Sequence, residues 1–266
     1  MSVPAEGELS RRRLFSGCAL GEQIHHRLIG FARFVTFVHS RAGGMTNGMA
    51  PPSPYTPLSR RFFAHDAPTL ARALLGQVLV HESTVGRTAG IIVETEAYDE
   101  TDPASHSAHG LTPRTAVMFG PAGHAYVYFS YGTHWCMNVV ADRKGRGAAV
   151  LLRALEPLEG LSLMAERRGL DLSAPKSQLR LARGPGCLTQ AMGIDAAHNG
   201  VDLYQGPLRV MRLGRRRSSL DIGVGPRIGV SKATAVPWRF FVVANPFVSQ
   251  PPKDRPQRRM AQRSSQ

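Results

Sequence analysis

The sequence predicts an α+β fold: a single domain with a curved, mainly antiparallel β-sheet core and helices packed around it. Strand-like runs follow one another between residues 77 and 155, with too few residues between them for crossover helices. Apolar residues make up 42% of the 266 residues, and no apolar run reaches the roughly 18 residues of a membrane span. The chain is therefore long enough for a globular domain with a sizeable core.

The expected elements follow from capping residues and apolar runs. A helix should run from Pro68 to Leu75, because Asp66 can cap its first turn and Gly76 can end it. Five strands should follow, over Gln77–Glu82, Gly90–Tyr98, His124–Ser130, His134–Ala141 and Ala148–Leu155. Two further helices, Pro157–Arg168 and Cys187–Met192, and three later strands, Leu208–Leu213, Arg227–Val230 and Arg239–Ala244, complete the expected domain.

The two ends of the chain are expected to lie outside the folded domain, which should cover residues 59–249. Residues 42–58 are rich in Gly and Pro, as is typical of a linker, so residues 1–58 are expected to be extension and linker. Met45 or Met49 could be the natural start; a basic arm that touches nucleic acid is the alternative reading of the extension. The tail, 250–266, has the Pro- and Arg-rich composition of a disordered segment.

Charge and cysteine content limit the partners and the compartment. The net charge is +14, and only four of the 33 basic residues are lysines. Residues 55–249 alone hold 22 basic and 15 acidic residues, so the excess does not come only from the ends. Because arginine binds phosphate through two parallel hydrogen bonds, a polyanion is the expected partner. Three widely spaced cysteines form neither a disulfide framework nor a zinc motif, which favours an intracellular protein.

The segment from Ile92 to Tyr98 is the most informative part of the sequence. Its residues Glu94, Glu96 and Tyr98 alternate, and alternate residues of a β-strand point to the same face. A strand that only had to pack would carry Val or Ile at these positions. Two carboxylates and a phenol on one face therefore predict the floor of a reaction site.

Aromatic residues flank this strand in the sequence. His106 lies in a long loop between two strands, and loops of this length in a compact domain are often functional. Tyr126 and Tyr128 should share one face of the next strand, and Tyr131 falls at its end beside Gly132. These side chains are candidates to hold a planar ring.

Two polar residues stand in otherwise apolar strands. Asn138 needs a defined hydrogen-bond partner there, and Arg153 should meet a carboxylate or a phosphate, since an unpaired buried charge is costly. The whole set predicts a pocket for a nucleic-acid base: aromatic rings to stack on it, an amide to test its edge, and a carboxylate with an arginine to activate water. Flipping a base costs a few kcal/mol and stacking returns about 1–3 kcal/mol, so such a pocket could select abnormal bases.

Several motifs together resemble the alkyladenine (3-methyladenine) DNA glycosylase family. They are Glu94-Thr95-Glu96-Ala97-Tyr98, Ala104-Ser105-His106-Ser107, Thr112-Pro113-Arg114, Met118-Phe119, the segments 126–138 and 150–158, Gly184-Pro185-Gly186 with Leu188 and Gln190-Ala191, Pro226-Arg227-Ile228-Gly229-Val230 and Asn245-Pro246-Phe247-Val248-Ser249. They occur in order across residues 59–249, which is more specific than any single motif.

The resemblance implies excision of alkylated or deaminated purines, such as 3-methyladenine, 7-methylguanine, hypoxanthine and ethenoadenine, from double-stranded DNA. It implies the following roles: Glu96 as the general base and Arg153 as its partner in holding water; Tyr98, His106 and Tyr128 as stacking residues; Asn138 as the residue that excludes guanine; and Tyr131 as the wedge inserted into DNA. It also implies a monomer without metal or cofactor, and no Schiff-base lysine, hence no strand cleavage.

One departure concerns the residue after Gly184-Pro185-Gly186. The resembling family often has lysine there, and this chain has Cys187. If that lysine contacts phosphate, this protein is expected either to bind DNA somewhat less tightly or to use a nearby arginine such as Arg183.

Two other functions remain open from the sequence alone. The first is a basic nucleic-acid-binding module without catalysis, in which Glu96 only pairs with Arg153. The second is a carbohydrate glycosidase with Glu94 and Glu96 as its acid/base pair, since i and i+2 side chains stand roughly 6–7 Å apart along a strand. Release of free purine from alkylated DNA separates both from the glycosylase.

Overall fold

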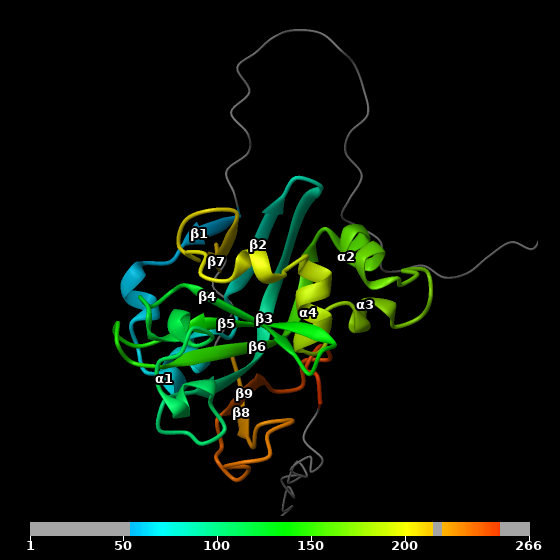
Figure 1. Cartoon of the computed structure of the whole chain (residues 1–266). Coiled ribbons are helices and arrows are strands. Elements are labelled where there is room, and N and C mark those ends of the chain that lie inside the picture. Colours follow the sequence, from blue (N-terminus) through cyan, green and yellow to red (C-terminus); the bar gives the residue numbers. More distant parts are fainter. Residues whose placement is uncertain (1–53, 215–219, 251–266) are drawn as a thin grey trace, which may run out of the picture. The chain divides into compact units, whose positions relative to one another are not determined.

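Antiparallel pairing organises the part of the chain that the computed structural model describes, residues 54–214 and 220–250 (Figure 1). Within these ranges one nine-stranded sheet has the order β1-β7-β2-β3-β6-β5-β4, and β9 pairs with both β3 and β8. The strands are β1 (Tyr55–Pro57), β2 (Val78–Ser83), β3 (Gly86–Tyr98), β4 (Ala125–Ser130), β5 (His134–Val140), β6 (Ala149–Glu159), β7 (Leu208–Leu213), β8 (Ile222–Gly225) and β9 (Arg239–Val242). The expected α+β fold is confirmed.

The helices are short and lie beside the sheet (Figure 1). They are α1 (Ala67–Leu74), α2 (Leu161–Arg168), α3 (Ser177–Arg180) and α4 (Pro185–Met192), with 3-10 turns η1 (Arg60–Phe63), η2 (His106–His109), η3 (Ala116–Phe119) and η4 (Ala196–His198). Helix α1 begins where the sequence predicts, because the Asp66 side chain accepts a hydrogen bond from the Thr69 N–H. No helix within the described ranges is long and apolar enough to cross a membrane.

Strand β3 occupies the centre of the sheet and changes partners along its length. Its first half pairs with β2, its second half pairs with β9 from Glu94 to Glu96, and β6 pairs with nearly all of its other edge. The register against β6 shifts on both sides of Glu94, as in a β-bulge. The bulge allows β3 to pair with β2 along its first half and with β9 along its second half. Glu94 is the first residue that pairs with β9.

Helix α1 fixes which face of β3 carries the polar residues. The Thr95 hydroxyl donates to the Ala71 carbonyl of α1 at 2.9 Å, so Thr95 points toward this helix. Its neighbours Glu94 and Glu96 therefore point to the opposite face. There they meet Arg153 of β6, while Leu152 beside it is fully buried in the main core. Apolar packing on one face thus supports a polar cluster on the other.

Three expected boundaries were wrong. Residues 55–57 were expected in a linker but form β1, which pairs with β7, and Tyr55 is buried with its hydroxyl 2.5 Å from Glu159. The predicted helix from Pro157 begins only at Leu161, since β6 continues along β3 to Glu159. In both cases a distant strand supplies pairing that the local composition does not reveal.

The third error concerns residues 227–230, which were expected to form a strand. They form a loop, and the nearby strand is β8. The Arg227 side chain is buried against Asp102, the Ile228 N–H donates to Glu96, and Gly229 has a φ of 79°. The segment is thus shaped by side-chain partners and not by a strand ladder. The expectations for residues 1–53 and 251–266 lie outside the described residues.

Gly160 forms the joint between β6 and α2, and its replacement should be costly. Its φ is 72°, a left-handed conformation, and an added Cβ would collide with the backbone oxygen of Arg87. We expect Gly160→Ala to lower the free energy of unfolding by roughly 2 kcal/mol or more, measured by urea denaturation.

Gly169 provides the matched control at the other end of α2. It is also left-handed, with a φ of 59°, but a Cβ there meets no atom within 4 Å. Gly169→Ala should therefore lower the free energy of unfolding only by the strain of a left-handed alanine, roughly 1 kcal/mol. Equal losses in the two variants would contradict the close approach at Gly160.

Candidate active site

Glu96 lies at the base of the polar face of β3 and is fully buried. Its Oε2 accepts hydrogen bonds from the Tyr98 hydroxyl at 2.8 Å and from the Arg153 guanidinium at 3.2 Å. Its Oε1 accepts from the Ile228 N–H at 2.7 Å. A carboxylate offers about four acceptor positions, so these three donors leave one position for another donor, such as water.

Glu94 accepts more hydrogen bonds than Glu96. Its Oε1 accepts from Arg153 Nε at 3.1 Å, Arg239 Nε at 2.7 Å and the Ser249 hydroxyl at 2.9 Å, and its Oε2 accepts from the Ser249 N–H at 2.6 Å. Two of these four donors are arginines, whereas Glu96 has three donors and one arginine. Glu94 is therefore the more firmly held of the two carboxylates and connects β3, β6, β9 and the segment around Ser249.

The pKa values of the two carboxyl groups shift in opposite directions. Burial raises the pKa of Glu96 above its ordinary value, and this exceeds the lowering by Arg153 and by the Ile228 N–H. Burial also acts on Glu94, but Arg153, Arg239 and Ser249 together lower its pKa. Glu96 is thus the stronger base of the two. The pKa of Arg153 is raised because Glu96 and Glu94 outweigh its burial.

Aromatic side chains from two segments meet above this floor. His106 of η2 lies with its ring centre 4.5 Å from that of Tyr128, and its Nδ1 is 2.9 Å from the Tyr126 hydroxyl. Burial lowers the pKa of His106, assisted by Arg114, so the neutral ring is favoured. The structure therefore brings His106, Tyr126 and Tyr128 into one wall, although the loop and the strand are 20 residues apart.

Asn138 and Tyr131 occupy the two ends of the β4–β5 hairpin. Asn138 is buried opposite Tyr126, and its Nδ2 donates to the Tyr126 carbonyl at 3.0 Å, which is the partner that its burial requires. Tyr131 is 87% exposed at the hairpin turn with a φ of 49°, unusual for a non-glycine residue. An aromatic ring held outward at such a turn is available to a partner molecule.

These side chains line one cavity of about 880 Å³. Six of the seven residues selected from the sequence line it: Tyr98, His106, Tyr128, Tyr131, Asn138 and Arg153. Glu96 lies directly behind Tyr98 and Arg153. Arg114 and Lys232 add positive charge to the wall, and no acidic side chain lines the cavity. Lys232 lies in the loop between β8 and β9 and was not among the residues expected at the site.

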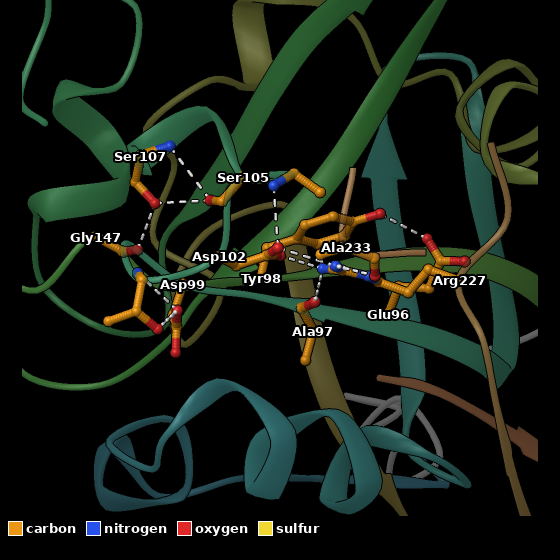
Figure 2. A network of polar contacts seen from close by, with 12 residues as sticks. Glu96, Ala97, Tyr98, Asp99, Asp102, Ser105, Ser107, Gly147, Arg227 and Ala233 are labelled. Carbon is orange, nitrogen blue, oxygen red and sulfur yellow. Dashed lines mark hydrogen bonds and ion pairs between the residues drawn. The ribbon is translucent and has the colours of Figure 1, made fainter. Parts of the chain in front are cut away.

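Sequence reasoning also missed the residues that support the site from behind. Arg239 lies at the start of an apolar strand, the same signal that identified Arg153, and it pairs with Glu94. Arg227 forms a buried ion pair with Asp102 (Figure 2). No sequence signal links either pair, because the partners are more than 100 residues apart.

The contacts of Arg183 and Cys187 bear on the departure after Gly184-Pro185-Gly186, but whether Arg183 contacts phosphate stays a prediction. Arg183 does not turn toward Cys187, because its Nε donates to the Val248 carbonyl at 2.8 Å. Arg168 of α2 contacts Cys187 instead, with its NH2 group 3.1 Å from the sulfur. Arg168 also donates to Gln190 and to the Leu181 carbonyl, so it is fixed on the first turns of α4.

Comparison with known proteins identifies the family of this chain. The family model described as methylpurine-DNA glycosylase matches residues 61–246, which include every residue of the site except the contacts from Ser249. The chain belongs to this family. It is a DNA glycosylase of the methylpurine type and a base-excision repair protein.

Relatives from distant microbes share most of the described chain. A protein of Rhodopseudomonas palustris (strain BisB5) is 50% identical over 194 residues, 73% of this chain and 90% of the relative. One of Methanoculleus marisnigri is 49% identical over 195 residues, 73% of this chain and 98% of the relative. One of Nitrosospira multiformis is 46% identical over 189 residues, 71% of this chain and 92% of the relative. All three are provisionally named 3-methyladenine DNA glycosylases.

The family and the geometry decide between the three functions left open by the sequence. A non-catalytic module is excluded by membership in a glycosylase family. A carbohydrate glycosidase would need two working carboxylates, and Glu94 is occupied by Arg153, Arg239 and Ser249. Glu96 has fewer donors than Glu94, and two of the residues that contact it, Tyr98 and Arg153, line the cavity.

Proposed function

We propose that this protein excises alkylated or deaminated purines from double-stranded DNA by activating a water with Glu96. The observation that carries the proposal is the unequal occupation of the two carboxylates on β3. Glu96 keeps one acceptor position and a raised pKa, and the two residues that cover it, Tyr98 and Arg153, line the cavity. Water held there can transfer a proton to Glu96.

The reaction follows from this placement. The water oxygen forms a bond to C1′ of the deoxyribose, the N-glycosidic bond breaks, and its electron pair leaves with the purine. The water proton passes to Glu96, while Arg153 holds the carboxylate and the water in place. A purine methylated at N3 or N7 carries a positive charge in the nucleotide and leaves as a neutral base, which lowers the barrier.

The cavity supplies the means to bind a flipped base. Tyr98 forms one side, and His106 and Tyr128 form the other, so a purine can stack between them. Asn138 is fixed by the Tyr126 carbonyl, so its amide can exclude a base with an extra exocyclic group, such as guanine. Lesions within reach of this design include 3-methyladenine, hypoxanthine and ethenoadenine, which lack the 2-amino group, and 7-methylguanine, which keeps that group but has a glycosidic bond weakened by its positive charge.

The enzyme acts as a monomer on this proposal, because a single chain supplies every named group. It leaves the DNA backbone intact, since water and not an amine attacks C1′. Metal or cofactor is not needed for this route, as Glu96 and Arg153 supply the base and the positive charge. Arg114 and Lys232 would meet phosphates beside the flipped nucleotide.

Glu96→Gln tests the general base. The amide keeps the shape but cannot accept the proton, so single-turnover excision of 3-methyladenine, hypoxanthine and ethenoadenine should fall at least about 100-fold. Binding to lesion-containing duplex should be retained, because the variant removes a negative charge from a site for a polyanion.

Glu82→Gln is the control, since Glu82 is an exposed glutamate of β2 that pairs only with surface arginines. It should excise like the parent. Excision by Glu96→Gln at the parental rate would contradict the assigned role. Covalent trapping of the parent on DNA by borohydride would contradict attack by water.

Tyr131→Ala tests the wedge at the hairpin turn. Loss of the exposed ring should reduce excision from duplex roughly tenfold or more, because the gap left by the flipped base is no longer filled. Excision from unstacked single-stranded substrate should fall much less. Val85→Ala is the control, since Val85 is another exposed apolar side chain, in the turn between β2 and β3. It should change excision from neither the duplex nor the single-stranded substrate. Equal losses on both substrates would count against the wedge.

A further inference from the structure

A buried arginine lies behind the tyrosine that faces the cavity. The Arg227 guanidinium carbon is 4.6 Å from the centre of the Tyr98 ring and 5.7 Å from that of Trp238. The Arg227 side chain is fully buried and does not line the cavity, whereas Tyr98 does. The guanidinium therefore lies over one face of the Tyr98 ring and outside the cavity lining, and Figure 2 shows Arg227 beside Tyr98. A base that stacks on Tyr98 from the cavity would use the other face. Its Nε–H has no acceptor within the described residues.

Asp102 neutralises this arginine. Both oxygens of its carboxylate accept from Arg227, one of them at 3.0 Å, and the aspartate side chain is almost fully buried. The same carboxylate accepts from the Ala104 N–H at 3.0 Å, in the turn that leads to His106. Asp102 thus connects Arg227, which lies over Tyr98, to the turn that precedes His106; Figure 2 shows Asp102 between Arg227 and Ser105.

The charge of this pair has a direct consequence for the base that stacks on Tyr98. An aromatic face attracts a cation through its quadrupole, and a second cation behind the ring opposes that attraction. Only the Tyr98 ring would separate a stacked base from the guanidinium. Over such a short distance in a buried site, an uncompensated positive charge on Arg227 would strongly repel a cationic base. A neutral base would be almost unaffected by it.

We propose that Asp102 is a specificity-determining residue, which allows the pocket to accept purines that alkylation has made cationic by neutralising Arg227 behind Tyr98. The inference rests on the proposed function and goes beyond it, since it separates cationic from neutral substrates. Asp102 does not touch the substrate and acts through Arg227 and Tyr98.

The test compares single-turnover excision of 3-methyladenine, a cationic lesion that lacks the 2-amino group of guanine, with that of hypoxanthine, a neutral one, in the same duplex. In Asp102→Asn the guanidinium keeps its charge and loses its counter-ion. The ratio of the two rates should fall about tenfold relative to the parent. A purely structural role for Asp102 would slow both reactions alike and leave the ratio unchanged, which would overturn the proposal.

Two further variants distinguish an effect of the Arg227 charge from a structural effect of losing Asp102. They also keep the proposal testable if Asp102→Asn folds poorly. The double variant Asp102→Asn/Arg227→Met removes both charges and should restore the parental ratio, whatever its absolute rates. Arg227→Met alone removes the cation and should not lower the ratio. A lowered ratio in either of these would also overturn the proposal.

The outcome for the parent protein distinguishes this inference from the function on which it rests. A parent that excises neither lesion would refute the proposed function. A parent that excises both, with one ratio shared by all variants, would refute only the role of Asp102.

Discussion

Arg153 donates to two buried carboxylates at once, and the rest of the site depends on how unequally these are otherwise satisfied. Glu94 has four donors and Glu96 has three. The more donors a buried carboxylate has, the more firmly it is held and the weaker it is as a base. The proposed distinction between a supporting and a reacting carboxylate thus rests on unequal hydrogen bonding of two residues of the same type, two positions apart.

Distant parts of the chain provide the donors that create this inequality. Arg239 comes from β9 and Ser249 from the segment after it, while Arg153 comes from β6 on the other edge of β3. The bulge at Glu94 allows β3 to pair with β9 there. The site therefore depends on the completed sheet and on the segment around Ser249, and it cannot form from strand β3 alone.

Local patterns of the sequence were sufficient to find the residues that meet at the cavity and insufficient to find the residues that support them. Alternation identified Glu94, Glu96 and Tyr98 on one face, and burial of a charge identified Arg153 as needing a carboxylate, which Glu94 and Glu96 supply. The capping residue placed α1 to within a residue. These features depend on residues close together in the chain, where periodicity and propensity are informative.

Long-range pairing explains what could not be predicted. Composition gave no sign that residues 55–57 would pair with β7, or that β6 would continue through Pro157. Arg227 looked like part of a strand, but its ion pair with Asp102 shapes the loop instead. The residues that fill Glu94 were missed for the same reason, since a hydrogen bond across 145 or 155 residues leaves no periodic trace.

The central claim is that Glu94 and Glu96 share Arg153, and the pH dependence of excision tests it most directly. Glu96 must be ionised to accept a proton, so the rate should rise with pH through the pKa of Glu96, which burial raises above the ordinary value of 4.5. In Glu94→Gln the negative charge that raises this pKa is lost, and Arg153 serves Glu96 alone. The rise on the acidic side of the pH–rate profile for hypoxanthine excision should therefore move to lower pH. In the control Glu82→Gln this part of the profile should not move. A rise that stays in place or moves to higher pH in Glu94→Gln would contradict the shared arginine.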